Sequence, residues 1–202
     1  IAYVENFYKK PRINWDILQK YAEGLIVTSS CLASTYCQYI MNGDVVNAKA
    51  WARKFKDLFQ DDFYLEVQPN QIPEQHMVNK ITSRISKELA IPMIATNDVH
   101  YTLQDDCFPH EVMLAMQVKK KMDDPKRFKF STDDFWFKSN EEMAATLKAT
   151  HSLSDEDIHE AMQNTVKVAE KCTARIEKGR YLTPYYNVPH GMTEADLLHE
   201  EA

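Results

Sequence analysis

A carboxylate and an imidazole follow an apolar run near the middle of the chain. The segment IPMIATNDVHY (residues 91–101) ends its apolar part before Asn97, Asp98 and His100. If the run is a β-strand, its side chains alternate between two faces, so Asp98 and His100 point to the same side. Such a pair can form half of a metal site, or a hydrogen-bonded pair with only a local role.

Two other apolar runs end in potential ligands. GLIVTSS (24–30) precedes Cys31, and DFYLEVQ (62–68) carries Glu66 and Gln68 near its end. Because ligands gather at the carboxyl ends of parallel strands, these residues are expected to meet. Thiolate, imidazole and carboxylate together suit zinc, and imidazole with carboxylate also suits manganese or iron. The strand ends are therefore a candidate metal site, with Cys31, Asp98 and His100 as candidate ligands and Glu66, Gln68 and Asn97 as candidate lining residues.

Each of these residues also has an ordinary structural interpretation. A cysteine after a strand is often a small buried apolar residue, and Glu66 can equally pair with a cation or orient a loop. The remaining cysteines lie in expected helices and are interpreted as packing residues: Cys37, Cys107 and Cys172. Four histidines are interpreted as solvated helix positions: His76, His151, His159 and His199.

Two further features of the second half have both structural and functional interpretations. His110 follows Asp106 by four residues in an expected helix, so it is interpreted as a hydrogen-bonded partner of that carboxylate. Lys119, Lys120 and Lys121 form a short basic run. The run is interpreted as a solvated helix end favoured by the helix dipole, or as a contact to phosphate.

The spacing of apolar residues predicts helices between the three runs. Residues 43–60 and 72–90 each carry a helical apolar stripe, which gives the order β–α–β–α–β. This order predicts a parallel sheet or an α/β barrel, with strands covered on both faces.

The second half of the chain is predicted to be mainly helical. Helices are expected over 105–118, 139–149 and 154–172, and a short strand or hairpin edge over 128–139. Ser139 with Glu142, and Ser154 with Asp157, have the spacing of capping boxes. Residues 180–191 are interpreted as a linker, followed by the start of another helix.

Composition limits the class of protein. The 202 residues are 44% hydrophobic and 27% charged, as in soluble globular domains. A net charge of -6 argues against a broad basic surface that wraps nucleic acid, although it leaves room for a local contact. Four cysteines without CxxC spacing predict a reducing cytoplasm, and no apolar run is long enough to span a membrane. No Gly-rich phosphate loop is present.

Five ordered segments resemble the bacterial replicative DNA polymerase III alpha subunits of the C-family, whether cellular or phage-encoded. They are GLIVTSSCLAS, DDFYLEVQPNQIPEQHMVN, IPMIATNDVHY, DDPKRFKFSTDDFWFKSNEEM and NTVKVAEKC. The resemblance implies the carboxyl-terminal part of a distorted (β/α) barrel, the PHP (polymerase and histidinol phosphatase) domain, over residues 1–179, mainly helical after about 101. Residues 180–202 would be a linker and the start of the polymerase palm. The chain is therefore expected to be a fragment.

The resemblance also implies a metal site. Cys31 of SSCL matches a family ligand, as do Asp98 and His100 of TNDVHY, and the complete domain would hold up to three divalent metal ions. Earlier ligands, from an H-x-H motif onward, would precede residue 1. Ser30 and Ser34 replace glycines common around this cysteine.

Three functions follow from the resemblance. The first is a DNA-directed DNA polymerase that uses Mg²⁺, primer-template and dNTPs, whose PHP domain removes nucleotides from a primer 3′ end; the palm aspartates would lie outside this chain. The second is a silent PHP module that supports the polymerase and meets a proofreading exonuclease, with a sliding clamp as a further partner. The third is a free-standing phosphoesterase similar to histidinol phosphatase, against which the palm-like tail from Tyr181 argues. A barrel cut in the middle leaves open strand edges, so the isolated fragment is expected to self-associate.

Overall fold

The computed structural model describes residues 2–179 and 186–202. Its contacts divide the chain into two compact units, Ile1–Lys171 and Cys172–Ala202. The second unit contains α8 (Glu194–Glu201), whose first turn is capped by the Thr193 hydroxyl, which accepts from the Asp196 N–H. The helix expected at the end of the chain is thus confirmed, while residues 180–185 of the expected linker lie outside the described residues.

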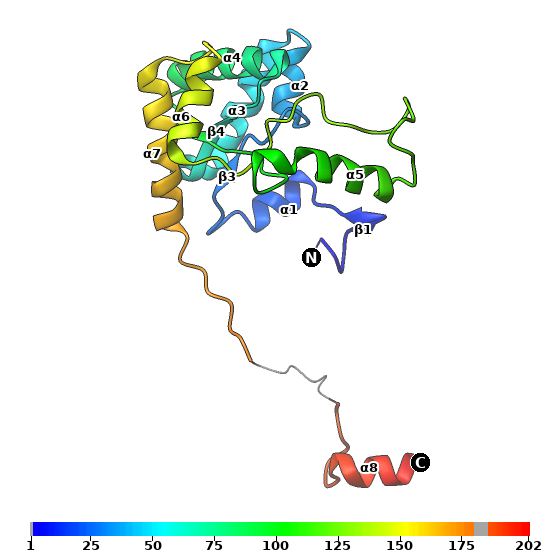
Figure 1. Ribbon diagram of the computed structural model, residues 1–202. Helices are drawn as coiled ribbons and strands as arrows, with labels where there is room; N and C mark the ends of the chain where they lie inside the picture. Colours follow the sequence, from blue (N-terminus) through cyan, green and yellow to red (C-terminus); the bar gives the residue numbers. More distant parts are fainter. Residues whose placement is uncertain (1, 180–185) are drawn as a thin grey trace. The chain divides into compact units, whose positions relative to one another are not determined.

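A small parallel sheet forms the centre of the first unit (Figure 1). Its strands are β3 (Val27–Thr28), β4 (Phe63–Val67) and β5 (Met93–Ala95), in the order β3–β4–β5. All five β4 residues are buried, as the apolar run predicts for a strand covered on both faces. A separate antiparallel pair joins β1 (Phe7–Tyr8) to β2 (Lys10–Pro11). The α/β class and the parallel sheet are confirmed. The described strands form an open three-stranded sheet, and that this sheet is part of a barrel stays a prediction.

The strands are shorter than expected because the backbone turns at both ends of the apolar runs. Gly24 and Ser30 have positive φ angles of 76° and 64°, so the first run is extended only at its centre. The third run stops at Ala95, and Asp98 has a φ of 48°. The strand alternation predicted to align Asp98 with His100 therefore does not reach these residues.

Helices connect and cover the strands as the spacing predicts. Polar caps begin several of them, such as the Ser139–Glu142 capping box of α6. The helices of the first unit are α1 (Trp15–Lys20), α2 (Thr35–Met41), α3 (Val45–Phe59), α4 (Pro73–Leu89), α5 (Cys107–Gln117), α6 (Asn140–Ala149) and α7 (Asp155–Lys171). Two 3₁₀ turns, Gln60–Asp62 and Gln104–Asp106, precede β4 and α5.

The core lies between the sheet and the helices α2, α3, α4 and α7. Leu65 and Val67 of β4, with Val78 and Ile85 of α4, are fully buried in one apolar cluster. On the β5 edge, the Asn164 side-chain amide of α7 donates a 2.7 Å hydrogen bond to the Met93 carbonyl. Helix α7 thus covers the edge strand and satisfies part of its backbone. None of the described helices is both long and apolar enough to cross a bilayer.

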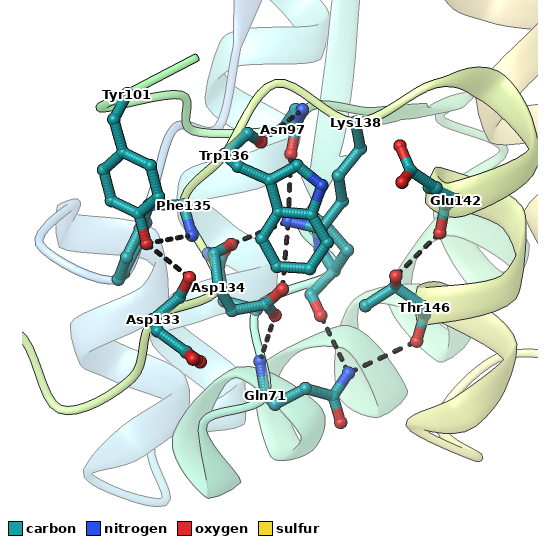
Figure 2. A network of polar contacts seen from close by, with 12 residues as sticks. Gln71, Asn97, Tyr101, Asp133, Asp134, Phe135, Trp136, Lys138, Glu142 and Thr146 are labelled. Carbon is teal, nitrogen blue, oxygen red and sulfur yellow. Dashed lines mark hydrogen bonds and ion pairs between the residues drawn. The ribbon is translucent and has the colours of Figure 1, made fainter. Parts of the chain in front are cut away.

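The segment between α5 and α6 has little regular structure. In place of the hairpin expected over 128–139, it forms one isolated parallel bridge between Tyr101 and Trp136. Polar contacts attach its last part to the loops after β4 and β5 (Figure 2). The segment therefore forms a wall beside the carboxyl ends of the strands.

Candidate functional site

Glu66 is a buried carboxylate that links the three strands. Its two oxygens accept hydrogen bonds from the hydroxyls of Thr28 and Thr96, both at 2.5 Å, and from the Gln68 side-chain amide at 3.0 Å. Its own N–H donates to the Ser29 hydroxyl at 2.8 Å. Neutral hydrogen-bond donors contact both oxygens of Glu66. Glu66 therefore holds the strand ends in position, in line with its structural interpretation as a residue that orients a loop.

Gln68 connects this cluster to a cavity. Its side-chain amide also lies 3.3 Å from the Thr96 hydroxyl, and its backbone pairs with the Asn79 side chain of α4. Gln68 lines a cavity of about 370 Å³ beside the strand ends, whereas Glu66 is not among the residues that line it. Gln68 therefore occupies the expected position at the site, and Glu66 lies behind it.

Two of the three expected metal ligands line this cavity. Cys31 comes from the loop before α2 and Asp98 from the loop after β5. His100 lies beside Asp98, with 3.4 Å between its Nε2 and Asp98 Oδ1, and 35% of each side chain is exposed. The structure thus joins Cys31 to Asp98 across one cavity and Asp98 to His100 by direct contact.

Packing fixes the orientation of the His100 ring. The ring meets Phe135 edge-on at 5.2 Å and lies 4.8 Å from the ring of Phe130. The backbone N–H of His100 donates to the Phe135 carbonyl at 2.9 Å. With the ring held in this way, the imidazole faces the Asp98 carboxylate, and the two side chains lie together at the edge of the cavity.

Left-handed backbone occurs on both sides of the cavity. Ser30 has a φ of 64° and Asp98 a φ of 48°, and neither residue is glycine. Such conformations cost on the order of 1 kcal/mol for a residue with a side chain and cluster at functional sites. The geometry accounts for a glycine preference at position 30, whereas Ser34 has a φ of -70° and caps α2 through its hydroxyl.

Asn70 is a cavity residue that sequence reasoning missed. Its side chain is 2% exposed, its amide nitrogen lies 3.5 Å from the Asp134 carbonyl, and its Oδ1 is buried without a hydrogen-bond partner among the described residues. A buried, unpartnered oxygen is costly unless a ligand or water satisfies it. An amide oxygen is a suitable ligand for a divalent cation, so Asn70 adds a donor to the wall that carries Cys31 and Asp98. The only sequence signal is its place just after a buried strand.

A buried ion pair lies behind the cavity, next to Asn70 and Gln71 (Figure 2). Lys138 Nζ lies 3.0 Å from Asp134 Oδ1, and the two side chains are 0% and 5% exposed. The ammonium group also lies 3.6 Å from the centre of the Trp136 ring and 3.5 Å from Asn97 Oδ1. Asn97 in turn donates to the Trp136 carbonyl at 3.1 Å. Asn97 is therefore held in the supporting network and is not among the residues that line the cavity.

His110 lies at a second cavity and does not pair with Asp106. The Asp106 carboxylate accepts from the Leu103 N–H at 2.9 Å, which caps the turn before α5. The His110 ring packs 5.3 Å from that of Tyr101, and both line a cavity of about 430 Å³. Burial raises the pKa of Tyr101 to about 12, and its hydroxyl donates to the Asp133 carbonyl. The predicted Asp106–His110 pair is therefore wrong.

The other cysteines and histidines differ from one another in burial. Cys37 is 1% exposed, which confirms its packing role, whereas Cys172 is exposed and that expectation is wrong. His76 is half-buried, with Nε2 buried and unpartnered among the described residues, so it is not a solvated position. The remaining expectations fit: Cys107 is half-buried, and His151, His159 and His199 are exposed, although His151 lies in the turn after α6.

The described residues provide donors for a metal ion without a complete ligand cluster. Among residues 2–179 and 186–202, no three His, Cys, Asp or Glu side chains are close enough to form a metal-binding group. The thiol of Cys31, the carboxylate of Asp98 and the unpartnered Oδ1 of Asn70 nevertheless line one cavity. This set suits a divalent cation in chemical type.

Comparison with known proteins identifies the relatives of the chain. Residues 1–70 match the PHP domain. The chain is 38% identical to DNA polymerase III subunit alpha of Thermus aquaticus over 98% of its length, and 38% identical to that of Aquifex aeolicus over 100%. The subunit of Treponema pallidum is 37% identical over 94% of the chain. The chain spans only 16–18% of the length of these relatives.

These matches confirm the resemblance inferred from the ordered segments. The matched PHP region contains Cys31, Glu66 and Asn70, and the similarity to the polymerase subunits extends through Asp98 and His100. The chain is therefore a relative of the bacterial DNA polymerase III alpha subunits, with PHP-domain sequence in its first 70 residues.

Proposed function

We propose that the chain is one segment of a replicative DNA polymerase alpha subunit. Residues 1–179 would form the carboxyl-terminal portion of a PHP domain, and residues 180–202 would lead into the palm. The observation that carries this proposal is similarity to the alpha subunits over nearly all of the chain. A free-standing phosphoesterase similar to histidinol phosphatase is less well supported, because the similarity continues past the PHP match.

The activity of the parent protein would be template-directed DNA synthesis in the cytoplasm. Its substrates would be primer-template DNA and dNTPs, with Mg²⁺ bound by palm aspartates outside this chain. A sliding clamp and a proofreading exonuclease are proposed partners. The relatives, which are named as DNA polymerase III alpha subunits, support this proposal.

Within this segment, Cys31, Asp98 and His100 are proposed to hold a divalent metal ion with help from Asn70. The shared cavity of Cys31, Asn70 and Asp98 supports this set, as does the contact between Asp98 and His100. Zinc, manganese and iron fit the donor types, and further ligands would complete the set. His100 would supply an imidazole nitrogen as a ligand beside the Asp98 carboxylate, from which it is separated by 3.4 Å.

The reaction proposed for this site is hydrolysis of the terminal phosphodiester bond at a DNA 3′ end. A divalent ion there would lower the pKa of a bound water and offset charge on the phosphoryl oxygens. The chain itself would contribute a carboxylate, a thiol and an amide oxygen from residues that line the cavity, together with the lining aromatic rings of Phe130 and Phe135. These rings would limit water around the reacting phosphate.

A silent supporting role is the second candidate. Two observations favour it: no complete ligand cluster occurs among the described residues, and both oxygens of Glu66 accept hydrogen bonds from the fold. In this case the strand ends would serve only to stabilise the polymerase.

Elemental analysis of the purified chain separates the two candidates. A triple variant, Cys31→Ala, Asp98→Ala and His100→Ala, removes the proposed ligands. A matched control, Cys172→Ala, Asp105→Ala and His159→Ala, removes the same residue types at exposed positions. Zinc, manganese or iron present in the wild type and the control but absent from the ligand variant is the expected result. Equal metal content in all three proteins would contradict the assignment of these ligands.

A further inference from the structure

A short basic segment stands out in this acidic chain. Residues 119–129, KKKMDDPKRFK, contain six Lys or Arg and two Asp, whereas the whole chain has 24 Lys or Arg and 30 Asp or Glu. The run of three lysines noticed in the sequence is only its first part. The basic segment therefore concentrates positive charge on a molecule that is negative elsewhere.

Most of these cations are not used by the fold. Lys120 pairs with Asp124 at 3.0 Å, and Arg127 pairs with Glu111. In the described part of the chain, no carboxylate lies within ion-pair distance of four exposed lysines, Lys119, Lys121, Lys126 and Lys129. Unpaired, exposed ammonium groups on one segment form a suitable surface for a polyanion.

An exposed aromatic side chain lies within the same segment. Phe128 is 55% exposed, and its ring meets Phe130 edge-on at 5.2 Å. Phe130 in turn stacks on His110 at 5.6 Å and packs against Phe135 at 4.6 Å. Phe128 is thus the outermost ring of a supported aromatic group, and a planar base can stack on such a ring.

The basic segment leads directly to the candidate metal site. Phe128 and Lys129 line the cavity of about 370 Å³ together with Cys31, Asn70 and Asp98. Figure 1 shows the chain leaving α5, bending, and then running back towards the rest of the first unit. A strand that follows the lysines would therefore bring its end into the cavity.

We propose that the basic segment, residues 119–129, binds single-stranded nucleic acid and guides its end to the cavity that holds Cys31 and Asp98. The lysines contact successive phosphates, and Phe128 stacks on a base near the cavity. The guiding role rests on the proposed phosphodiester hydrolysis, whereas the binding itself does not. Positive charge alternating with an exposed aromatic ring is typical of surfaces that bind single strands without sequence preference.

Other anionic partners fit these features less well. A duplex keeps its bases stacked inside, so it offers no base to Phe128. An anionic membrane would attract the lysines, but neither a cavity with metal-binding side chains nor a ring supported from behind is needed for that contact. The single strand is the ligand that uses the charge, the ring and the cavity together.

Fluorescence anisotropy with a labelled oligothymidine of ~15 nucleotides tests the charge contribution. The measurement is made in EDTA, so that no metal-dependent cleavage contributes. The test variant combines Lys121→Glu, Lys126→Glu and Lys129→Glu. It is expected to bind at least about tenfold more weakly. The salt slope, that is, the slope of log K against log salt concentration, should fall in magnitude by about two, since each phosphate contact contributes about 0.7. The matched control is Arg53→Glu, Lys80→Glu and Arg84→Glu, which changes three exposed cations elsewhere. Equal weakening by both triple variants would overturn the proposal.

Phe128→Ala tests the stacking contribution. Loss of one stacked base is expected to weaken binding about five- to hundredfold without changing the salt slope. Phe7→Ala is the control, because Phe7 is 56% exposed and lies outside the basic segment. Unchanged affinity in Phe128→Ala would overturn the aromatic part of the site, and equal binding to anionic phosphatidylserine vesicles would overturn the choice of nucleic acid.

The outcomes separate this proposal from the proposed function. Oligonucleotide binding in EDTA that depends on the lysines would support the basic segment, and elemental analysis that finds no metal in the protein before EDTA is added would separately contradict the hydrolytic site. Metal-dependent cleavage that is unaffected by the lysine and Phe128 variants would contradict the basic segment and support the hydrolytic site.

Discussion

Two groups of polar residues lie next to each other at the strand ends and differ in how their hydrogen bonds are satisfied. Glu66 is 9% exposed and accepts from Thr28, Thr96 and Gln68. The Asp98 side chain is 35% exposed, and among the described residues its carboxylate has a polar contact with His100 alone. In the first, closed group, Glu66 has its oxygens hydrogen-bonded within the fold. The second, open group is Cys31, Asn70, Asp98 and His100, and it keeps oxygen atoms at the cavity that could bind a metal ion.

The difference teaches where ligand binding is possible on this sheet. A buried carboxylate that already accepts three hydrogen bonds has little acceptor capacity left for a metal ion. Asp98 is partly exposed on left-handed backbone, and the Asn70 oxygen is buried and unpartnered among the described residues. Neither side chain has to give up several hydrogen bonds to bind a metal ion. Substitutions in the closed group should therefore change stability, and substitutions in the open group should change binding.

The largest effect is expected at the ion pair behind the cavity. Lys138→Met leaves the Asp134 carboxylate buried without its cation, and the free energy of unfolding should fall by about 3–5 kcal/mol. Urea denaturation followed by circular dichroism measures this loss. The double variant Asp134→Asn with Lys138→Met should recover part of it, since Asn still accepts from the Gln71 N–H. No recovery would mean that the pair acts through its packing and not its charge.

A smaller loss is expected for the strand-linking carboxylate. Glu66→Ala removes the acceptor of two hydroxyls and one amide and leaves a cavity, which should cost about 2–4 kcal/mol. The matched control is Glu88→Ala, which breaks a surface ion pair with Lys49 and should cost about 0.5 kcal/mol. Similar losses in both variants, measured by urea denaturation, would remove the distinction between the closed and open groups.

Cysteine reactivity should differ between the buried Cys37 and the exposed Cys172. Burial raises the pKa of Cys37 to about 11, opposed by the hydrogen bond with Ser34 and reinforced by Cys31 and Glu66. At pH 8 only about one Cys37 side chain in a thousand is then a thiolate, so alkylation should be about two orders of magnitude slower than for an ordinary exposed cysteine. Iodoacetamide labelling with peptide mass spectrometry measures each site. Exposed Cys172 is the internal control, and equally fast labelling of Cys37 would contradict its burial.

The smallest effect is a gain in stability. Ser30→Gly relieves a left-handed backbone conformation and should raise the free energy of unfolding by about 0.5–1 kcal/mol. Thermal denaturation measures the change. Ser34→Gly is the matched comparison, since Ser34 caps α2, and it should gain nothing. Destabilisation by Ser30→Gly would show that the serine side chain has a role not seen in its backbone geometry.

Much of the fold follows from local sequence signals. The apolar stripes of α3, α4 and α7 and the Ser139 cap are short-range features, so they predict the helices well. Strand lengths and barrel closure depend on positive φ angles and on distant pairing. Neither is visible in a short window of residues. The expected strand lengths needed correction, whereas the barrel stays a prediction.

The site could be predicted only in part for the same reason. Cys31, Asp98 and His100 were identifiable by residue type and by position after strands. Asn70 was missed because its importance comes from burial and from a contact with Asp134, 64 residues away. Asp134 and Lys138 are only four residues apart, but their burial depends on distant segments such as the loop that carries Gln71. Glu66 could be placed at the strand ends, but its hydroxyl partners could not.

The most direct measurement is the shift in melting temperature caused by Mn²⁺ in three proteins. Wild type and Ser30→Gly keep the proposed ligands, whereas Asp98→Gly removes one at a position with the same left-handed backbone. At a metal concentration about 100 times the Kd, binding stabilises the folded protein by about 2.7 kcal/mol. Mn²⁺ should therefore raise the melting temperature of wild type and Ser30→Gly and leave that of Asp98→Gly unchanged. No shift in wild type, or the same shift in all three, would contradict a metal site in the open group.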